Sequence, residues 1–416
     1  GSEAIYYQPY VRGTALEPTA REAAGGLAAA ANVIDIEDHT ALFAGEDRGS
    51  LRDTAPYDIV MIQYTSGTTG FPKGVLLHQQ GLIQSNHDLF HRWQLSAGDT
   101  VMCPFPLFHT AGSAVSVLGT FSRGGTLLLV SLFDPGVMVD AIARERPQLV
   151  GGVATMIFAI VEAARTAGKR LDCVEKIVSG GAMVAPELNR AARDIFGVPI
   201  LIVYGQTETC PPITATRPDD ADADLTETIG QPIAHIEASI RDPHDNSVCP
   251  VGIQGEICMR GYNVMAGYND NPEATAKTID AEGWLHTGDL GTMDARGYLK
   301  ITGRVKEMII RGGENLFPAE IENAMLEHPA VAEVAVAGIP DEKWGEVVAC
   351  FMRAKDGDQI PTESELKAFI RERLAPHKTP AHWIWVSEYP LTGSGKIQKF
   401  ALRDGFVEGK YTAQEA

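Results

Sequence analysis

Cysteines are few in this sequence, and none are spaced as CxxC. The six cysteines are scattered through 416 residues. A chain of this length can bury enough apolar surface to fold without disulfide bonds. We therefore interpret the cysteines as reduced thiols and expect a cytoplasmic protein.

Long apolar runs are also absent. The longest stretch worth testing, Leu149 to Val161, is too short to span a bilayer, so we interpret it as a buried strand leading into a core helix. The N-terminal residues lack the basic region and the apolar region of a signal peptide. The sequence therefore predicts no membrane span.

Positive charge is scarce. The chain has 35 Lys and Arg against 54 Asp and Glu, a net charge of -19. A field of this sign repels nucleic acid and anionic lipid surfaces, so we expect no nucleic-acid partner. It also repels phosphorylated small molecules, so a site for one must carry its own cations or backbone N–H donors.

Short strands alternate with helices through the first half of the chain. Apolar, mostly β-branched runs occur at residues 59–64, 126–130, 176–178 and 199–203, and the first two of these are interpreted as buried strands. Asp134 and Pro135 have the residue types of an N-cap and a first helical position. This alternation predicts an α/β fold with a mainly parallel sheet.

The pattern changes after residue 225. Short alternating segments broken by turn residues predict a β-rich subdomain over residues 225–303. Residues 304–416 then predict a small separate α/β domain with helices near 318–326 and from Thr362, where Glu365 completes a capping box. The expected organisation is a large N-terminal region, 1–303, and a small C-terminal domain, 304–416, with no internal repeats.

The strongest local signal is the segment YTSGTTGFPKG. Its glycines can turn backbone N–H groups toward an anion, and its hydroxyls and lysine add donors and a cation. It is not a Walker A loop, because Pro72 and Gly74 stand where that motif needs Gly and Ser or Thr. The alternative is a polar glycine turn. We predict a pyrophosphate cradle formed by Thr65, Ser66, Gly67, Thr68, Thr69, Gly70 and Lys73.

From this loop to about Arg403 the sequence resembles the adenylate-forming acyl-CoA synthetases, together with carrier-loading adenylation domains and firefly luciferase. Further motifs follow in the order of that family. Only 64 residues precede Thr65, fewer than in typical members, so we expect part of the N-terminal subdomain to be missing.

The resemblance implies a nucleotide site built from several loops. In PLFHTAG, before an expected helix, His109 would lie at the mouth of the acyl pocket; the alternative is a core histidine. SGGAMV would let adenine approach Gly180, Gly181 and Ala182. In YGQTET, Tyr204 would give an aromatic face for adenine, Thr207 a hydroxyl near the α-phosphate, and Glu208 a ligand for Mg²⁺.

Two further motifs would bind the ribose. Asp289, expected in a turn, would accept hydrogen bonds from the ribose hydroxyls, and Arg304 would contact the ribose and a phosphate. An isolated TGD sequence is equally typical of an Asx-turn.

The small domain would supply the rest of the machinery. The resemblance implies a hinge at Lys306 and a catalytic lysine, Lys396, on a glycine loop, although a lysine in a turn is usually just exposed. Residues expected to line the coenzyme A path are Gly312, Gly313, Glu314, Trp344 and Lys378. Some relatives have an aromatic residue and an arginine where this chain has His377 and Thr379.

The sequence thus predicts an ATP-dependent acyl-CoA synthetase that uses ATP, Mg²⁺ and coenzyme A. The alternatives are an enzyme that loads a carrier protein, a luciferase-like oxygenase and a non-catalytic nucleotide-binding remnant. A hydrophobic fatty or aryl acid is the expected substrate, because the residues expected near the pocket are small or apolar: Gly112, Thr155, Cys210, Pro211 and Pro212. The sequence makes no prediction of oligomeric state.

Overall fold

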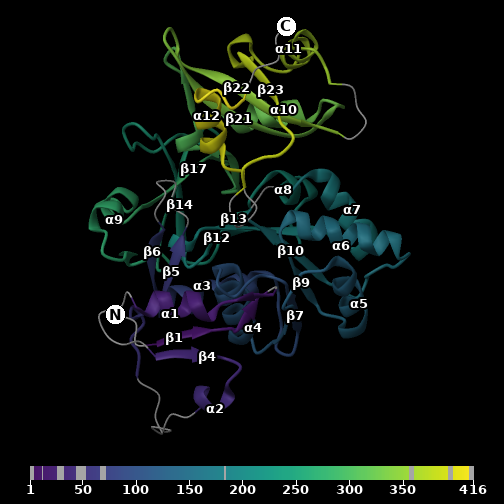
Figure 1. Ribbon diagram of the computed structural model, residues 1–416, viewed down its shortest axis with the longest axis vertical. Helices are drawn as coiled ribbons and strands as arrows, with labels where there is room; N and C mark the ends of the chain where they lie inside the picture. Colours follow the sequence, from purple (N-terminus) through teal and green to yellow (C-terminus); the bar gives the residue numbers. More distant parts are fainter. Residues whose placement is uncertain are drawn as a thin grey trace. The chain divides into compact units, whose positions relative to one another are not determined.

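The computed structural model describes residues 4–11, 13–25, 32–43, 53–65, 72–181, 184–355, 360–391 and 397–411 (Figure 1). The chain forms two compact units, Gly1–Ala55 and Pro56–Ala416. In the first unit β1 (Ala4–Tyr7) pairs in parallel with β4 (Asn32–Asp35), and β2 (Tyr10–Val11) pairs with β3 (Thr14–Ala15). Its helices are α1 (Glu17–Gly25) and α2 (His39–Leu42).

A seven-stranded sheet is the centre of the second unit. Its order is β13-β12-β11-β10-β9-β7-β8, and the pairs from β11 to β8 are parallel. The strands are β7 (Thr100–Cys103), β8 (Thr126–Leu129), β9 (Leu149–Gly151), β10 (Lys176–Gly180), β11 (Ile200–Gly205), β12 (Pro212–Ala215) and β13 (Gln231–Pro232). The predicted α/β fold with a mainly parallel sheet is confirmed.

Helices cover both faces of this sheet, because alternate strand residues point to opposite sides. Ile177 and Ile202 pack into one core with α5 (Pro135–Glu145), α6 (Ala154–Thr166) and α7 (Pro186–Phe196). Val178 and Leu201 pack into the other core with α3 (Gln79–Arg92). The predicted cap of α5 is confirmed, since the Asp134 carboxylate accepts from Val137 N at 2.8 Å.

The region after residue 225 is rich in β-strands, as expected, while the subdomain bounds 225–303 stay a prediction. An antiparallel sheet joins β14 (Ile236–Arg241), β15 (Gly255–Gly261), β17 (Leu285–Met293) and β18 (Leu299–Arg304), in that order. A separate three-stranded sheet has the order β16 (Gly267–Tyr268), β6 (Lys73–His78), β5 (Ile59–Thr65), and α9 (Pro272–Thr278) follows β16.

The strand predicted at 59–64 forms as β5, but the prediction that it is buried was wrong. Ile59, Val60 and Ile62 are 41%, 51% and 47% exposed, whereas Val75 and Leu77 on the neighbouring β6 are 0% exposed. The same prediction for 126–130 was wrong as well, since no residue of β8 is buried and Leu129 is 55% exposed. The reason is position: β5 and β8 are both edge strands of their sheets. An apolar run predicts a strand but does not say how many neighbours that strand has.

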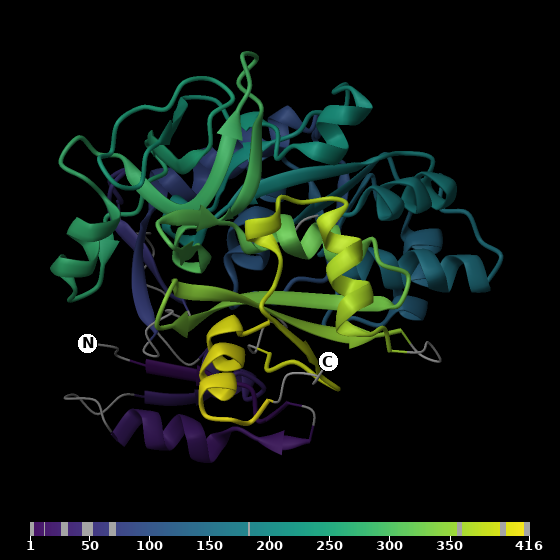
Figure 2. The same ribbon diagram turned by 90° about the horizontal axis from the view of Figure 1, so that it is seen from above.

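The last hundred residues form an α/β arrangement, as predicted. Its strands are β19 (Ile309–Arg311), β20 (Glu314–Leu316), β21 (Val331–Asp341), β22 (Gly345–Ala354) and β23 (His382–Trp385). One core contains residues of α10 (Pro318–Leu326) and α11 (Glu363–Arg371), and the other contains Leu402 of α12 (Lys399–Val407). Figure 2 shows α12, in yellow, on one side of the long strands. The Thr362–Glu365 capping box is present.

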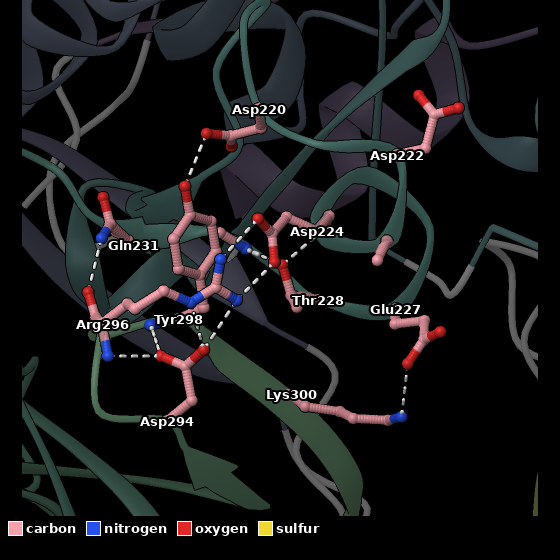
Figure 3. Close-up of polar contacts among 12 residues, drawn as sticks. Asp220, Asp222, Asp224, Glu227, Thr228, Gln231, Asp294, Arg296, Tyr298 and Lys300 are labelled. Atoms are coloured by element: carbon pink, nitrogen blue, oxygen red, sulfur yellow. Dashed lines mark hydrogen bonds and ion pairs between the residues drawn. The ribbon is translucent and has the colours of Figure 1, made fainter.

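Polar contacts tie the β17–β18 hairpin to α8 (Asp222–Glu227) and the chain before it (Figure 3). The Arg296 guanidinium donates to both oxygens of the buried Asp224 carboxylate at 2.7 and 2.9 Å, and Nε donates to Asp294 at 2.9 Å. The Tyr298 hydroxyl donates to Asp220 at 2.6 Å. Gln231 Nε2 donates to the Arg296 carbonyl at 2.6 Å. These contacts fix the hairpin against the antiparallel end of the large sheet.

Within the described part of the chain, no helix combines the length and the apolar character that crossing a membrane requires.

We expect Asp224→Ala to lower the free energy of unfolding by about 1–3 kcal/mol, because hydrogen bonds to charged groups contribute about that much. Asp222→Ala on the same helix is the matched control. Asp222 is exposed and pairs with Arg193, and such surface pairs contribute about 0–1 kcal/mol. Urea denaturation of both variants measures the difference, and equal losses would contradict this account of the hairpin.

Candidate nucleotide and acyl-transfer site

Asp289 is the centre of a buried polar group. The residue is 3% exposed, and its carboxylate accepts from the Tyr204 hydroxyl at 2.7 Å and from Gln206 Nε2 at 2.9 Å. Arg304 Nε lies 2.9 Å from the other carboxylate oxygen. Burial, together with the Asp289 charge, raises the pKa of Tyr204 well above its usual value. Three residues that the sequence analysis took from separate motifs therefore form one hydrogen-bonded cluster.

The predicted turn at Asp289 was wrong. Asp289 lies in strand β17, where it is the cross-strand partner of Arg304 on β18. The pairing is not local in sequence, so a turn-like TGD could not reveal it. Gln206 was not assigned a role from the sequence, although its place in YGQTET, directly after a strand, was a usable signal.

A second group connects the phosphate segment to Glu208. Thr65 and Lys73 are cross-strand partners at the ends of β5 and β6. Lys73 Nζ lies 4.8 Å from the centre of the Tyr268 ring, and the Tyr268 hydroxyl donates to Glu208 Oε1 at 2.9 Å. Burial and the Glu208 charge raise the pKa of Tyr268. Tyr268 was missed because it lies about 60 residues beyond the YGQTET motif.

A cavity of about 230 Å³ opens at the same place. Its lining residues are Tyr64, Pro72, Lys73, Gly74, Asn269, Asp270 and Asn271. Of the predicted cradle, Ser66, Gly67, Thr68, Thr69 and Gly70 lie outside the described residues, so their phosphate contacts stay predictions.

The glycines of SGGAMV have a packing role of their own. A Cβ on Gly180 would lie 2.7 Å from the Val203 carbonyl oxygen of the adjacent strand, and Gly181 has φ +80°. Ala182 lies outside the described residues. Contact of adenine with this segment stays a prediction.

His109 is exposed, so the alternative of a core histidine was wrong. Its Nδ1 accepts from Ala111 N at 3.1 Å, at the start of the π-helical segment Ala111–Leu118. The expected helix after PLFHTAG is therefore present. Gln63 Nε2 of β5 donates to the neighbouring Phe108 carbonyl at 2.7 Å.

The structure gives little support to the residues chosen for the acyl pocket. Thr155 is exposed, and Gly112 packs so closely on the Pro106 carbonyl oxygen that a Cβ would lie 2.4 Å from it. Cys210 is buried, with φ +57°, directly after the short helix that contains Thr207 (Thr207–Thr209).

Residues expected near coenzyme A lie together in part. Gly312, with φ +60°, donates its N–H to the Trp344 carbonyl at 2.7 Å. Arg311 and Lys343, which the sequence analysis missed, place their cationic groups 5.3 and 4.9 Å from the centre of the exposed Trp344 ring. Glu314 lies 3.5 Å from His377. Lys378 pairs with Glu320 at 2.5 Å, so a phosphate would compete with that carboxylate.

The expected hinge follows the Asp289 group directly. Lys306 lies in the short helix Val305–Glu307, two residues after Arg304. The next residue, Glu307, and Glu322 of α10 both pair with the largely buried Lys399 of α12, at 2.7 and 2.8 Å. Lys396 lies outside the described residues, and its catalytic role stays a prediction.

Comparison with known proteins agrees with this geometry. The sequence model named AMP-binding enzyme matches residues 13–269, and that of the AMP-binding enzyme C-terminal domain matches residues 320–396. The chain belongs to the AMP-binding enzyme family. The resemblance inferred from the motifs is confirmed.

Relatives within this family include acyl-CoA ligases. YngI, an inferred acyl-CoA synthetase of Bacillus subtilis (strain 168), is 40% identical over 352 residues, 84% of this chain and 64% of that protein. The human mitochondrial medium-chain acyl-CoA ligase ACSF2 is 37% identical over 354 residues, 84% of this chain and 57% of that protein. The chain spans less than two thirds of the length of these curated relatives.

A solved family structure is similar along most of the chain. The o-succinylbenzoate CoA synthetase MenE from Bacillus subtilis, in complex with the acyl-adenylate intermediate OSB-AMP, has a TM-score of 0.79 and 30% identity. The similarity covers 90% of this chain and 75% of MenE.

Since the AMP-binding enzyme family binds a nucleotide, the Tyr204–Asp289 bond can be tested directly. We expect Tyr204→Phe to weaken AMP binding about 10–150-fold, because a hydrogen bond to a charged carboxylate contributes about 1.5–3 kcal/mol. Calorimetric titration measures the change. Tyr262→Phe is the control, since its hydroxyl donates to Asp88 instead. If Tyr204→Phe bound AMP with unchanged affinity, the bond from Tyr204 to Asp289 would have no role in nucleotide binding.

Proposed function

We propose that this chain is an acyl-CoA synthetase that works in two steps. In the first, a carboxylic acid and ATP give an acyl-adenylate and pyrophosphate. In the second, the acyl-adenylate and coenzyme A give acyl-CoA and AMP. The proposal rests above all on the cluster around Asp289.

This cluster supports nucleotide binding because the negative charge of Asp289 is stabilised by hydrogen-bond donors that a nucleotide could replace. A buried carboxylate needs hydrogen-bond donors, and here Tyr204, Gln206 and Arg304 supply them. A ribose that enters would offer two hydroxyl donors to the same oxygens and would exchange with some of these contacts. The Arg304 side chain is half exposed, so it can turn toward a phosphate.

The chemistry of the first step requires leaving-group stabilisation. A carboxylate oxygen attacks the α-phosphorus, and the bond from that phosphorus to the pyrophosphate oxygen breaks. In our proposal Lys73 and the segment after Thr65 hold the departing pyrophosphate. Lys396 offsets the negative charge at the reacting centre, since a preorganised cation there lowers the barrier.

Glu208 fits the proposed Mg²⁺ by its chemistry. A hard carboxylate oxygen beside the phosphates of a substrate is the usual protein contribution to an Mg²⁺ site. Tyr268 orients this carboxylate by its hydrogen bond to Oε1. When bound, the ion would neutralise phosphate charge.

Coenzyme A as acceptor is supported by the surface around Trp344. An exposed indole ring with two cations beside it suits a nucleotide that carries phosphates. The names of YngI and ACSF2 both state acyl-CoA formation. We propose a hydrophobic fatty or aryl acid as the substrate, in keeping with the medium-chain acids in the name of ACSF2.

The two half-reactions give a direct test. We expect Lys396→Ala to lower the adenylation rate by at least about 100-fold, the scale seen when one charge-stabilising group is removed. Thioester formation from supplied acyl-adenylate should stay near the parental rate, because the hinge would carry Lys396 away from the site before that step. Pyrophosphate release and acyl-CoA formation are measured separately, and equal loss in both would overturn the proposal that Lys396 leaves the site between the two steps.

We expect the opposite result from Lys306→Pro. Proline fixes φ at about -65° and should prevent rotation of the backbone at the hinge. Adenylation should persist while acyl transfer is lost. A variant that makes thioester at the parental rate would show that the chain does not turn at this residue.

A further inference from the structure

Three metal-ligating side chains meet on one face of the β-rich sheet, outside the groups described above. Glu256 and Cys258 are two residues apart on β15, so both point to the same face. His286 on β17 is the cross-strand partner of Cys258. One carboxylate oxygen, one thiol and one imidazole nitrogen lie within 4.8 Å of one another.

The distances suit a tetrahedral ion. Cys258 Sγ lies 3.5 Å from His286 Nδ1, and Glu256 Oε2 lies 2.8 Å from the same nitrogen. Zinc bonds of about 2.3 Å to sulfur and about 2.0–2.1 Å to nitrogen or oxygen place such ligand atoms about 3.3–3.6 Å apart. The thiol is already at that separation, and the carboxylate needs to move by only about half an ångström.

A neighbouring carboxylate has the position of an orienting group. Asp280 Oδ2 lies 3.6 Å from His286 Nε2, on the opposite side of the ring from Cys258. Asp280 is itself held, since its Oδ1 accepts from the backbone N–H groups of Glu282 and Trp284 at 2.9 Å. Metal-bound histidines usually donate their second ring N–H to such a group.

Charge and access also permit a cation. Besides the three ligands, the charged groups nearby include Asp280, Glu282, Arg241 and Arg260, and the two guanidinium groups lie over the Trp284 ring at 4.5 and 4.6 Å. Cys258 and Glu256 are buried, but the His286 side chain is 23% exposed and gives a route inward.

We propose that Glu256, Cys258 and His286 form a site for Zn²⁺, and that zinc bound there weakens nucleotide binding. One sulfur, one nitrogen and one oxygen ligand favour zinc over Mg²⁺, which prefers oxygen alone. On binding, Zn²⁺ forms a bond to Cys258 Sγ while the thiol proton leaves to solvent. The proton of the neutral His286 ring is then on Nε2, which faces Asp280.

The proposed effect on the nucleotide site follows from one carboxylate. Glu256 Oε1 accepts from Gly288 N at 2.8 Å, and Gly288 directly precedes Asp289. The Thr287 hydroxyl donates to the Ile257 carbonyl at 2.6 Å and accepts from Asp289 N at 3.1 Å. A zinc ion that moves the Glu256 carboxylate about half an ångström away from His286 therefore disturbs the backbone that positions Asp289.

Cobalt titration of the whole chain tests binding without any enzyme assay. We expect one equivalent of Co²⁺ to give the near-ultraviolet charge-transfer absorbance of a cobalt thiolate, and Zn²⁺ to displace it. Cys258→Ser should abolish this absorbance, whereas the neighbouring Cys249→Ser should keep it. Asp280→Asn should weaken zinc binding about 10–100-fold, as loss of an orienting group does.

If Cys258→Ser does not fold, X-ray absorption spectroscopy of the zinc-loaded parental protein tests for the sulfur ligand instead. It should give one sulfur at about 2.3 Å with nitrogen or oxygen ligands. Absence of the thiolate signal in folded parental protein, or its persistence in Cys258→Ser, would overturn the proposal.

The coupling to the nucleotide site is measured with a sulfamoyl analogue of an acyl-adenylate, which has no phosphate to chelate zinc. Zinc should weaken binding of the analogue about tenfold, and by linkage the analogue should weaken zinc binding by the same factor. Cys258→Ser should bind the analogue as tightly as the zinc-free parental chain does, whether or not zinc is present. Equal zinc sensitivity in both would refute the coupling, and this binding assay does not depend on the proposed acyl-transfer activity.

Discussion

The buried carboxylate of Asp289 sets the geometry on which the proposed site depends. An unpaired polar group at such a position is costly, so its oxygens must meet donors from elsewhere in the chain. Those donors come from β11, from the segment after it and from the end of β18. The large sheet and the β-rich sheet therefore have to be held in one arrangement for the cluster to form.

Contacts far from Asp289 maintain that arrangement. The Arg296 group fixes the β17–β18 hairpin to α8, as Figure 3 shows. In addition, Arg92 of α3 donates to the carbonyls of Ala215, Gln231 and Pro232. These three residues belong to β12 and β13, the antiparallel strands at the end of the large sheet. Partial burial lowers the pKa of Arg92 to about 10.

Features that depend on neighbouring residues in the sequence could be predicted. The caps at Asp134 and Thr362 formed as expected, because a side chain that reaches a backbone N–H three residues away needs little from the rest of the fold. The parallel sheet followed from the alternation of strands and helices. Motifs brought Tyr204, Asp289 and Arg304 into one hypothesis, and the structure brings them into contact.

Features that depend on distant pairing could not be predicted. The exposure of β5 is set by its place at the edge of a sheet, and the strand conformation of Asp289 by its pairing with Arg304. Tyr268 and Arg311 became candidates only when the fold placed them beside Glu208 and Trp344. Lys396 and most of the phosphate segment lie outside the described residues, so their roles still rest on the motifs.

The most direct test of the account is the product balance of one reaction. The purified chain is incubated with ATP, Mg²⁺, coenzyme A and a panel of fatty and aryl acids, and AMP and acyl-CoA are quantified together. The account predicts AMP and thioester in equal amounts, each dependent on both the acid and coenzyme A. Formation of ADP in place of AMP, or of AMP without any thioester across the panel, would contradict it.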